Sequence, residues 1–215
     1  MKIYGESAHS AGLPTPRLTI NDGGIHPGAW VSFRDPAVDV GTLGRVLDAG
    51  ACGIIFPTVE DPATAATLVA ATRFAPRGKR SYGPTRRSPR YAKPAPGGME
   101  GDALCILMIE TAAGLANLDA ILATGPDAIF VGPYDLSLSL GMTPEELTGE
   151  GQDGILADIA RRCREANVVP GIYTGEPMLS ENMISLGFRF MPVASDTGLL
   201  AVAARDAVEA RHLRR

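Results

Sequence analysis

The chain has 215 residues and a formal charge of −4. This acidic balance argues against nucleic acid and anionic membranes as partners, because both attract basic surfaces. Hydrophobic residues make up 45% of the chain and charged residues 20%, which is ordinary for a globular protein, and the length suits one domain spanning residues 1–215.

Three cysteines are scattered along the chain without any C-x-x-C pair: Cys52, Cys105 and Cys163. We interpret them as reduced thiols of a cytoplasmic protein and as small core residues. The longest apolar run, from Ala103 to Ile109, is far too short for a membrane span. The first residues also lack the basic and apolar segments of a secretion signal.

Strand-like and helix-like patterns alternate along the chain. The predicted strands are short apolar runs without polar alternation, which is typical of strands covered on both faces. They are Lys2–Gly5, Ala29–Phe33, Gly53–Pro57, Leu104–Ile109, Ala128–Gly132, Val168–Tyr173 and Phe188–Val193.

Helices are predicted between these strands. Asp61 and Pro62 have the residue types of an N-cap and a first helical position, and Asp196 stands where it would cap a last helix. Apolar side chains recur at helical spacing in three places: Ala65, Leu68, Val69 and Thr72; Leu115, Leu118, Ile121 and Leu122; Leu199, Leu200, Ala203 and Val208.

Repeated strand–helix units predict a parallel sheet with right-handed crossovers. No G-x-G-x-x-G follows the first strand, so an open dinucleotide-binding sheet is unsupported. Polar residues at the C-terminal ends of several strands favour a (β/α) barrel instead. Seven strands are predicted, whereas such a barrel closes with eight. We expect the eighth strand to precede Met1.

The connection from Arg77 to Gly98 is long and cationic. It holds no acid before Glu100, and its basic residues are Arg77, Lys79, Arg80, Arg86, Arg87, Arg90 and Lys93. In an acidic protein such a loop indicates an anionic substrate or a subunit contact. A solvated surface loop is the alternative, and the sequence leaves both open.

Two acids follow neighbouring predicted strands. Glu110 closes Leu104–Ile109, and Asp135 comes just after Ala128–Gly132. In a barrel both carboxylates reach the C-terminal face, where a hard divalent cation with oxygen ligands would neutralise them. The alternative for each acid alone is a place at the start of a helix.

Three further polar residues are candidates. Arg34 ends the strand Ala29–Phe33 and would stabilise developing oxygen charge, unless it pairs at the surface with Asp35 or Asp39. His9 is a candidate base with Glu6 as its carboxylate partner, and the alternative is a loop histidine.

Other chemistries find little support. The chain has no G-x-S-x-G nucleophile motif and no G-x-x-x-x-G-K-[ST] phosphate loop. Its lysines, Lys2, Lys79 and Lys93, do not lie inside apolar strands, where a Schiff-base lysine is expected. The residues therefore favour a metal-dependent reaction.

Several stretches together carry a family resemblance. They are 45–51 with Phe56-Pro57, 73–83, Met108-Ile109-Glu110-Thr111, Gly132-Pro133-Tyr134-Asp135-Leu136-Ser137, Pro170-Gly171-Ile172 and Asp196-Thr197. The chain resembles the HpcH/HpaI aldolase/citrate lyase family, whose type members are the class II 2,4-dihydroxyhept-2-ene-1,7-dioate aldolases.

This resemblance implies a TIM-type (β/α) barrel of the phosphoenolpyruvate/pyruvate superfamily kind. Family chains begin about one β/α unit earlier, so the resemblance is to a barrel lacking its first β/α unit. It also implies that Glu110 and Asp135 bind a divalent metal ion (Mg²⁺, Mn²⁺ or Co²⁺). The implied assembly is a homo-oligomer, a hexamer by family resemblance.

The same resemblance assigns roles to the remaining candidates. Arg34 matches an arginine that contacts the 2-oxo oxygen of pyruvate, and His9 matches the catalytic base. Glu6 stands where the family has an aspartate beside that histidine. We further expect the backbone at Gly83 and Gly132–Pro133 to hold the substrate carboxylate.

The function implied is that of a class II pyruvate aldolase. Such an enzyme reversibly cleaves a 4-hydroxy-2-oxo acid to pyruvate and an aldehyde through a metal-bound pyruvate enolate. Three alternatives stay open: oxaloacetate decarboxylation, lysis of a citramalyl- or malyl-CoA at the same site, and a truncated, non-catalytic paralogue.

Overall fold

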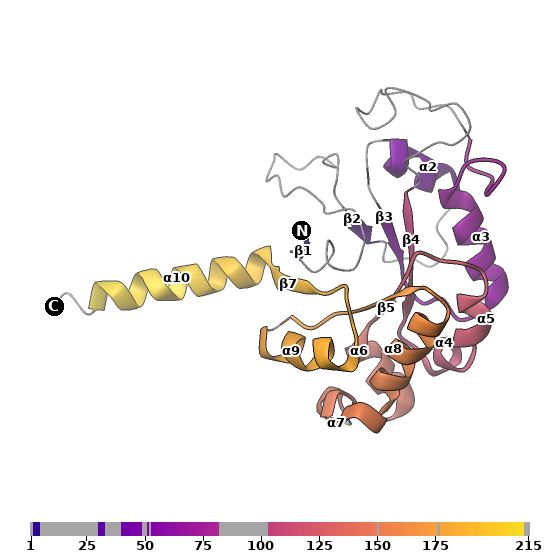
Figure 1. Ribbon diagram of the computed structural model, residues 1–215. Coiled ribbons are helices and arrows are strands. Elements are labelled where there is room, and N and C mark those ends of the chain that lie inside the picture. The colour runs from indigo at the N-terminus through magenta and orange to yellow at the C-terminus, as the bar shows by residue number, and fades with distance from the viewer. Residues whose placement is uncertain are drawn as a thin grey trace.

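The computed structural model describes residues 2–4, 30–32, 40–48, 51, 53–81, 103–149, 151–175 and 177–212. Five strands form one parallel sheet in the order β2–β3–β4–β5–β6 (Figure 1). They are β2 (Trp30–Ser32), β3 (Gly53–Phe56), β4 (Leu104–Ile109), β5 (Ala128–Val131) and β6 (Val169–Ile172). Parallel pairing in chain order confirms the predicted succession of β/α units.

The central strands are buried on both faces, which explains why they lack polar alternation. Ile54 and Leu107 belong to a large apolar cluster that includes helical side chains. On the opposite face Ile55 and Ile106 join a smaller cluster containing Phe130. The large cluster packs the helices onto one face of the sheet, and the small cluster lies on the other face.

Helices follow the strands as predicted. The structure contains α2 (Val40–Asp48), α3 (Pro62–Thr72), α4 (Ala112–Ala116), α5 (Leu118–Leu122), α6 (Pro133–Leu140), α7 (Pro144–Gly149), η2 (Gly151–Asp153), α8 (Ile155–Glu165), α9 (Pro177–Leu186) and α10 (Asp196–His212). Asp61 caps α3 by accepting hydrogen bonds from the N–H groups of Ala63 and Thr64, at 2.9 Å each. The predicted α3 stripe is buried. The second stripe is divided between α4 and α5 at Asn117.

The first and last strands differ from the prediction. β7 is Pro192–Ser195 and pairs antiparallel with β1 (Lys2–Tyr4), outside the parallel sheet. In the predicted strand Phe188–Val193, a single parallel bridge joins Phe190 to Gly171. Proline at 192 has no N–H to continue hydrogen bonding to β6, and the chain turns away there.

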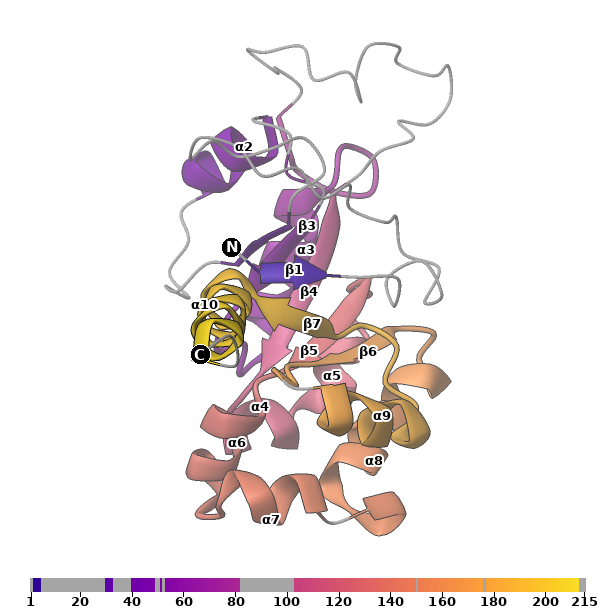
Figure 2. The same cartoon turned by 90° about the vertical axis from the view of Figure 1, so that its left-hand side faces the viewer.

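Helix α10 projects from the body of the molecule, with the β1–β7 pair between it and the main sheet (Figure 1, Figure 2). Every side chain described from Thr197 to Ala210 is exposed. The predicted apolar residues of this helix therefore face solvent in the single chain. None of the helices in the described segments combines the length and hydrophobicity that a membrane span requires.

Candidate active site at the ends of β3, β4 and β5

Glu110 directly follows β4 and is only 9% exposed. One carboxylate oxygen, Oε1, accepts hydrogen bonds from the backbone N–H of Thr58 at 2.7 Å and from its hydroxyl at 2.9 Å. Within the described segments Glu110 makes no other hydrogen bond or ion pair. A nearly buried carboxylate thus has one oxygen held in place and one oxygen, Oε2, available for another ligand.

Gly132, at the end of β5, leaves room for this carboxylate. A Cβ atom at position 132 would lie 3.0 Å from Oε2 of Glu110 and 3.1 Å from its Cβ. The N–H of Gly132 donates to the carbonyl oxygen of Ile109 at 3.2 Å, so it continues the pairing of β5 with β4. The glycine brings the start of α6 close to Glu110.

Asp135 lies in the first turn of α6, and its side chain is exposed. It makes no hydrogen bond or ion pair among the described residues. Because β4 and β5 are hydrogen-bonded neighbours with Ile109 opposite Val131, both acids come from the C-terminal ends of adjacent parallel strands. A position in the first helical turn also suits a carboxylate electrostatically.

The alternative that Glu110 caps a helix is wrong. Thr111 is the N-cap of α4, and its hydroxyl oxygen accepts the N–H of Gly114 at 3.1 Å. Glu110 is instead turned toward Thr58 on the neighbouring strand end.

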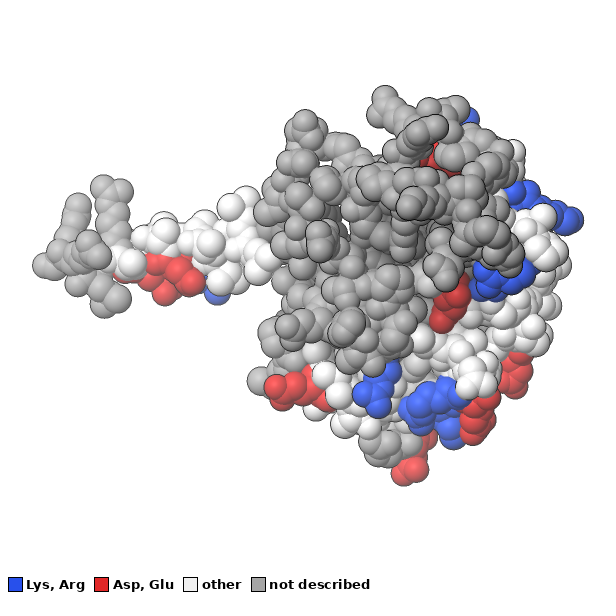
Figure 3. All heavy atoms as spheres, turned by 45° about the horizontal axis from the view of Figure 1, so that its top comes forward, with Lys and Arg blue, Asp and Glu red and all other residues white. Residues whose placement is uncertain are grey.

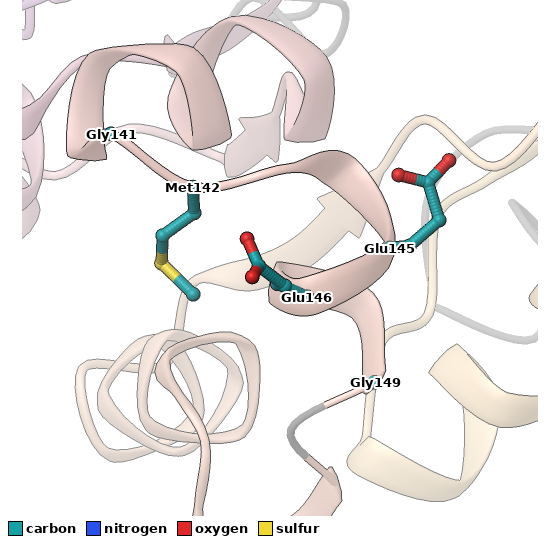
Figure 4. A pocket seen from close by; sticks show the side chains of 5 residues that line it. All are labelled: Gly141, Met142, Glu145, Glu146 and Gly149. Atoms are coloured by element: carbon teal, nitrogen blue, oxygen red, sulfur yellow. The ribbon is translucent and has the colours of Figure 1, made fainter.

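A second acidic region is less suited to a metal. A hollow between α6 and α7 is lined by Gly141, Met142, Glu145, Glu146 and Gly149. Glu146 points toward Met142 while Glu145 points away (Figure 4). Glu146 already accepts the N–H of Thr143 at 2.7 Å, as in a capping box for α7. Among the residues with described positions, no group of three or more His, Cys, Asp or Glu side chains could hold a metal.

Part of the cationic connection serves the fold. Arg80 is 6% exposed, forms an ion pair with Asp48 at 2.8 Å and lies 4.5 Å above the ring of Phe74. These contacts attach the segment after α3 to the end of α2. The rest of the connection, from residue 82 to Gly98, lies outside the described residues.

The two thiols that the structure describes are not candidates for catalysis. Cys105 and Cys163 are buried and free, as predicted for core residues, while Cys52 lies outside the described segments. Burial raises the pKa of Cys163 to about 12 and raises that of Cys105 as well. Both therefore stay protonated and unreactive at neutral pH.

Comparison with known proteins decides the family. The model of the HpcH/HpaI aldolase/citrate lyase family matches residues 28–203. The chain belongs to this family. It is 37% identical over 193 residues to a hydroxypyruvate/pyruvate aldolase of Rhizorhabdus wittichii, covering 89% of this chain and 75% of that protein.

Two further relatives agree. A 4-hydroxy-2-oxo-heptane-1,7-dioate aldolase of Salmonella heidelberg is 35% identical over 189 residues, covering 84% of this chain and 68% of that protein. The crystal structure of a HpcH/HpaI aldolase/citrate lyase family protein from Burkholderia cenocepacia superimposes with a TM-score of 0.71 at 28% identity, covering 85% of this chain and 73% of the other. These similarities confirm the TIM-type α/β fold and the carbon–carbon lyase class.

The predicted site residues of this HpcH/HpaI family member are only partly described. Glu6, His9, Arg34 and Gly83 lie outside the described residues, so their roles stay predictions. The N–H of Gly132 is already donated to Ile109, and proline at 133 has none. The predicted contact of Gly132–Pro133 with a substrate carboxylate therefore gains no support from backbone donors.

Thr58 is the site residue that sequence reasoning missed. It follows Phe56-Pro57 at the C-terminal end of β3, next to β4 in the sheet. The rule that found Glu110 and Asp135, a polar residue just after an apolar strand, applies equally to this threonine. Its backbone conformation, with a φ of 51°, could not be predicted, because threonine rarely adopts it.

Proposed function

We propose that this protein is a metal-dependent class II aldolase that cleaves a 4-hydroxy-2-oxo acid to pyruvate and an aldehyde. Relatives at 35–37% identity carry pyruvate aldolase and 4-hydroxy-2-oxo acid aldolase names. The observation that carries the proposal is the Glu110 carboxylate, which is nearly buried, anchored through Oε1 and open at Oε2.

The residues present fit a hard divalent cation such as Mg²⁺, Mn²⁺ or Co²⁺. Glu110 and Asp135 would hold it with carboxylate oxygens, which such ions prefer. The space that Gly132 leaves beside Oε2 is consistent with a ligand at that oxygen. When bound, the ion supplies Lewis-acid stabilisation of negative charge developing on a 2-oxo acid.

The remaining steps fall to groups of the chain itself. The guanidinium of Arg34 would bind the 2-oxo oxygen and stabilise charge that accumulates there. His9 would remove the proton of the 4-hydroxyl group as the C3–C4 bond breaks, with Glu6 holding the imidazole in the required tautomer. These roles follow from the family's motif positions.

The test is the release of pyruvate from a panel of 4-hydroxy-2-oxo acids. The purified full chain is assayed with Mg²⁺, Mn²⁺ or Co²⁺ and after removal of metal with a chelator. We expect pyruvate release that is lost on chelation and restored by metal. Protein that binds the metals but releases no pyruvate from any substrate would instead support the non-catalytic alternative.

Oxaloacetate and citramalyl-CoA belong in the same panel. A higher kcat/KM for either than for every 4-hydroxy-2-oxo acid would replace the aldolase assignment by decarboxylase or acyl-CoA lyase.

We also propose that the chain forms a homo-oligomer through α10. Eight consecutive uncharged residues, 197–204, are all exposed on this projecting helix, and Figure 3 shows its half nearer the body as a largely uncharged surface. An exposed apolar surface on an isolated helix is costly unless another chain covers it. A second copy is the expected partner, as the family resemblance implies.

A further inference from the structure

Thr58 gives both of its donors to one oxygen of Glu110. The N–H and the hydroxyl reach Oε1 at 2.7 and 2.9 Å. Donors that converge on one oxygen fix the rotation of the whole carboxylate, because the other oxygen must then point away from them. Glu110 is therefore held so that Oε2 faces Gly132.

The backbone at Thr58 is bent to make these bonds. Its φ of 51° is in the left-handed region, which β-branched residues avoid. The chain before and after this residue is bonded to β4: Phe56, two residues earlier, pairs with Leu107, and the N–H of Val59 donates to the carbonyl oxygen of Met108 at 3.2 Å. The unusual conformation is thus confined to the residue whose N–H is redirected to Glu110. Such outliers cluster where geometry serves function.

We propose that Thr58 is a positioning residue that reserves Oε1, so that Glu110 binds its cation through Oε2 alone, and thereby favours small octahedral cations over Ca²⁺. This inference rests on the proposed function, in which Glu110 is a metal ligand. Ca²⁺ accepts bidentate carboxylates and six to eight ligands, whereas Mg²⁺ requires near-ideal octahedral geometry. An oxygen already occupied by two hydrogen bonds is a poor partner for bidentate binding.

The experiment measures cation affinity directly. Binding of Mn²⁺ and of Ca²⁺ to the full chain is measured by calorimetry for the wild type, Thr58→Val, Thr58→Ser and Glu110→Gln. Valine keeps the size and β-branching of threonine and loses only the hydroxyl, and serine restores the hydroxyl. Thr124→Val is the matched control, since its partly buried hydroxyl bonds the carbonyl oxygen of Ile121 at 2.7 Å, in another part of the chain.

We expect Thr58→Val to weaken Mn²⁺ binding about tenfold, as is typical when a ligand's supporting hydrogen bond is removed. Ca²⁺ binding should weaken less, so that the preference for Mn²⁺ over Ca²⁺ falls. Thr58→Ser and Thr124→Val should behave like the wild type. If Thr58→Val does not fold, Thr58→Gly removes the same hydroxyl without β-branching in the left-handed region and should show the same loss of preference.

The contrary outcomes are distinct. Suppose that Glu110→Gln abolishes binding. If Thr58→Val then binds both cations with wild-type affinity, or loses affinity equally for both, the role assigned to Thr58 is wrong. A wild-type protein that binds neither cation, or a Glu110→Gln variant that binds as well as wild type, would overturn the proposed metal site itself.

Discussion

The strand ends around Glu110 and the helix α10 differ in how far their side chains are contacted by other parts of the chain. At the strand ends a nearly buried carboxylate has both donors of Thr58 and a space left by Gly132. On α10 the apolar side chains Leu199 and Leu200 are 49% and 71% exposed. The first region is organised within a single chain, whereas the apolar surface of α10 is covered by none of the residues that the structure describes.

This difference separates a property that a single chain determines, the geometry of the Glu110 carboxylate, from one that depends on a second chain, the burial of α10. Packing of β3, β4 and β5 fixes the direction of Glu110, so the affinity of the proposed metal site should be a property of the single chain. The fraction of chains whose α10 is covered by another copy should depend on protein concentration, because association is governed by mass action. Substitutions in the two regions should therefore have separable effects.

Glu110→Gln should have the largest effect. The amide keeps an oxygen for Thr58 but removes the charge that a divalent cation requires, so kcat/KM should fall by at least about a thousandfold, as expected when several kcal/mol of Lewis-acid stabilisation are lost. Pyruvate release under saturating metal measures this. Glu60→Gln, an exposed acid in the same loop as Thr58, should retain activity. Equal losses in the two variants would contradict the site.

Leu200→Asp should weaken association of subunits. If α10 is covered in the oligomer, losing one buried leucine raises the dissociation constant at least about tenfold, because such a side chain contributes about 1.5–3 kcal/mol. Sedimentation velocity over a range of concentrations measures the change. Ile184→Asp, at another exposed apolar position on α9 that is 51% exposed, should leave the assembly unchanged. A Leu200→Asp variant that sediments like the wild type would remove α10 from the interface.

Gly132→Ala tests whether the space beside Glu110 matters. The added methyl group would lie 3.0 Å from Oε2, so the carboxylate must shift, and we expect metal affinity to fall about tenfold. Gly44→Ala is the matched control: no atom lies within 4 Å of a Cβ there. Within α2 it should stabilise the protein by about 1 kcal/mol. Unchanged metal binding in Gly132→Ala would show that Glu110 has room to move.

Much of the described core was predictable from the sequence. Apolar runs such as Leu104–Ile109 have a single plausible structure when both faces are covered, and β4 has the predicted bounds. Asp61-Pro62 identified the start of α3 because capping is a local interaction. The position of Glu110 and Asp135 after adjacent strands was predictable, because strand ends in a parallel sheet share one edge; their role as metal ligands stays a prediction.

The features that the sequence did not predict depend on contacts between distant parts of the chain. The pairing of β1 with β7 joins residues almost a full chain length apart, and neither segment has a pattern that names its partner. Thr58 was missed because the left-handed conformation depends on Glu110 in another strand and not on the threonine itself. For Arg80 the sequence leaves open a substrate or subunit contact and a solvated loop, whereas its contacts with Asp48 and Phe74 bury it within the fold. Non-local contacts decide each of these cases.

The smallest effect should come from Asp61→Asn at the start of α3, a helix that, unlike α10, buries one face against the body. The N–H of Thr64, its hydroxyl and the N–H of Ala63 lower the pKa of the Asp61 carboxyl below its ordinary value of 3.8. As pH falls, the unfolded state takes up this proton first, so the contribution to stability is present above 3.8 and is lost as pH falls through the lower folded-state pKa. Asparagine caps equally well but does not titrate. Chemical denaturation from about pH 5 to about pH 3 should therefore show a slightly steeper loss of stability for the wild type than for Asp61→Asn, whereas parallel curves would mean that the cap is charge-independent.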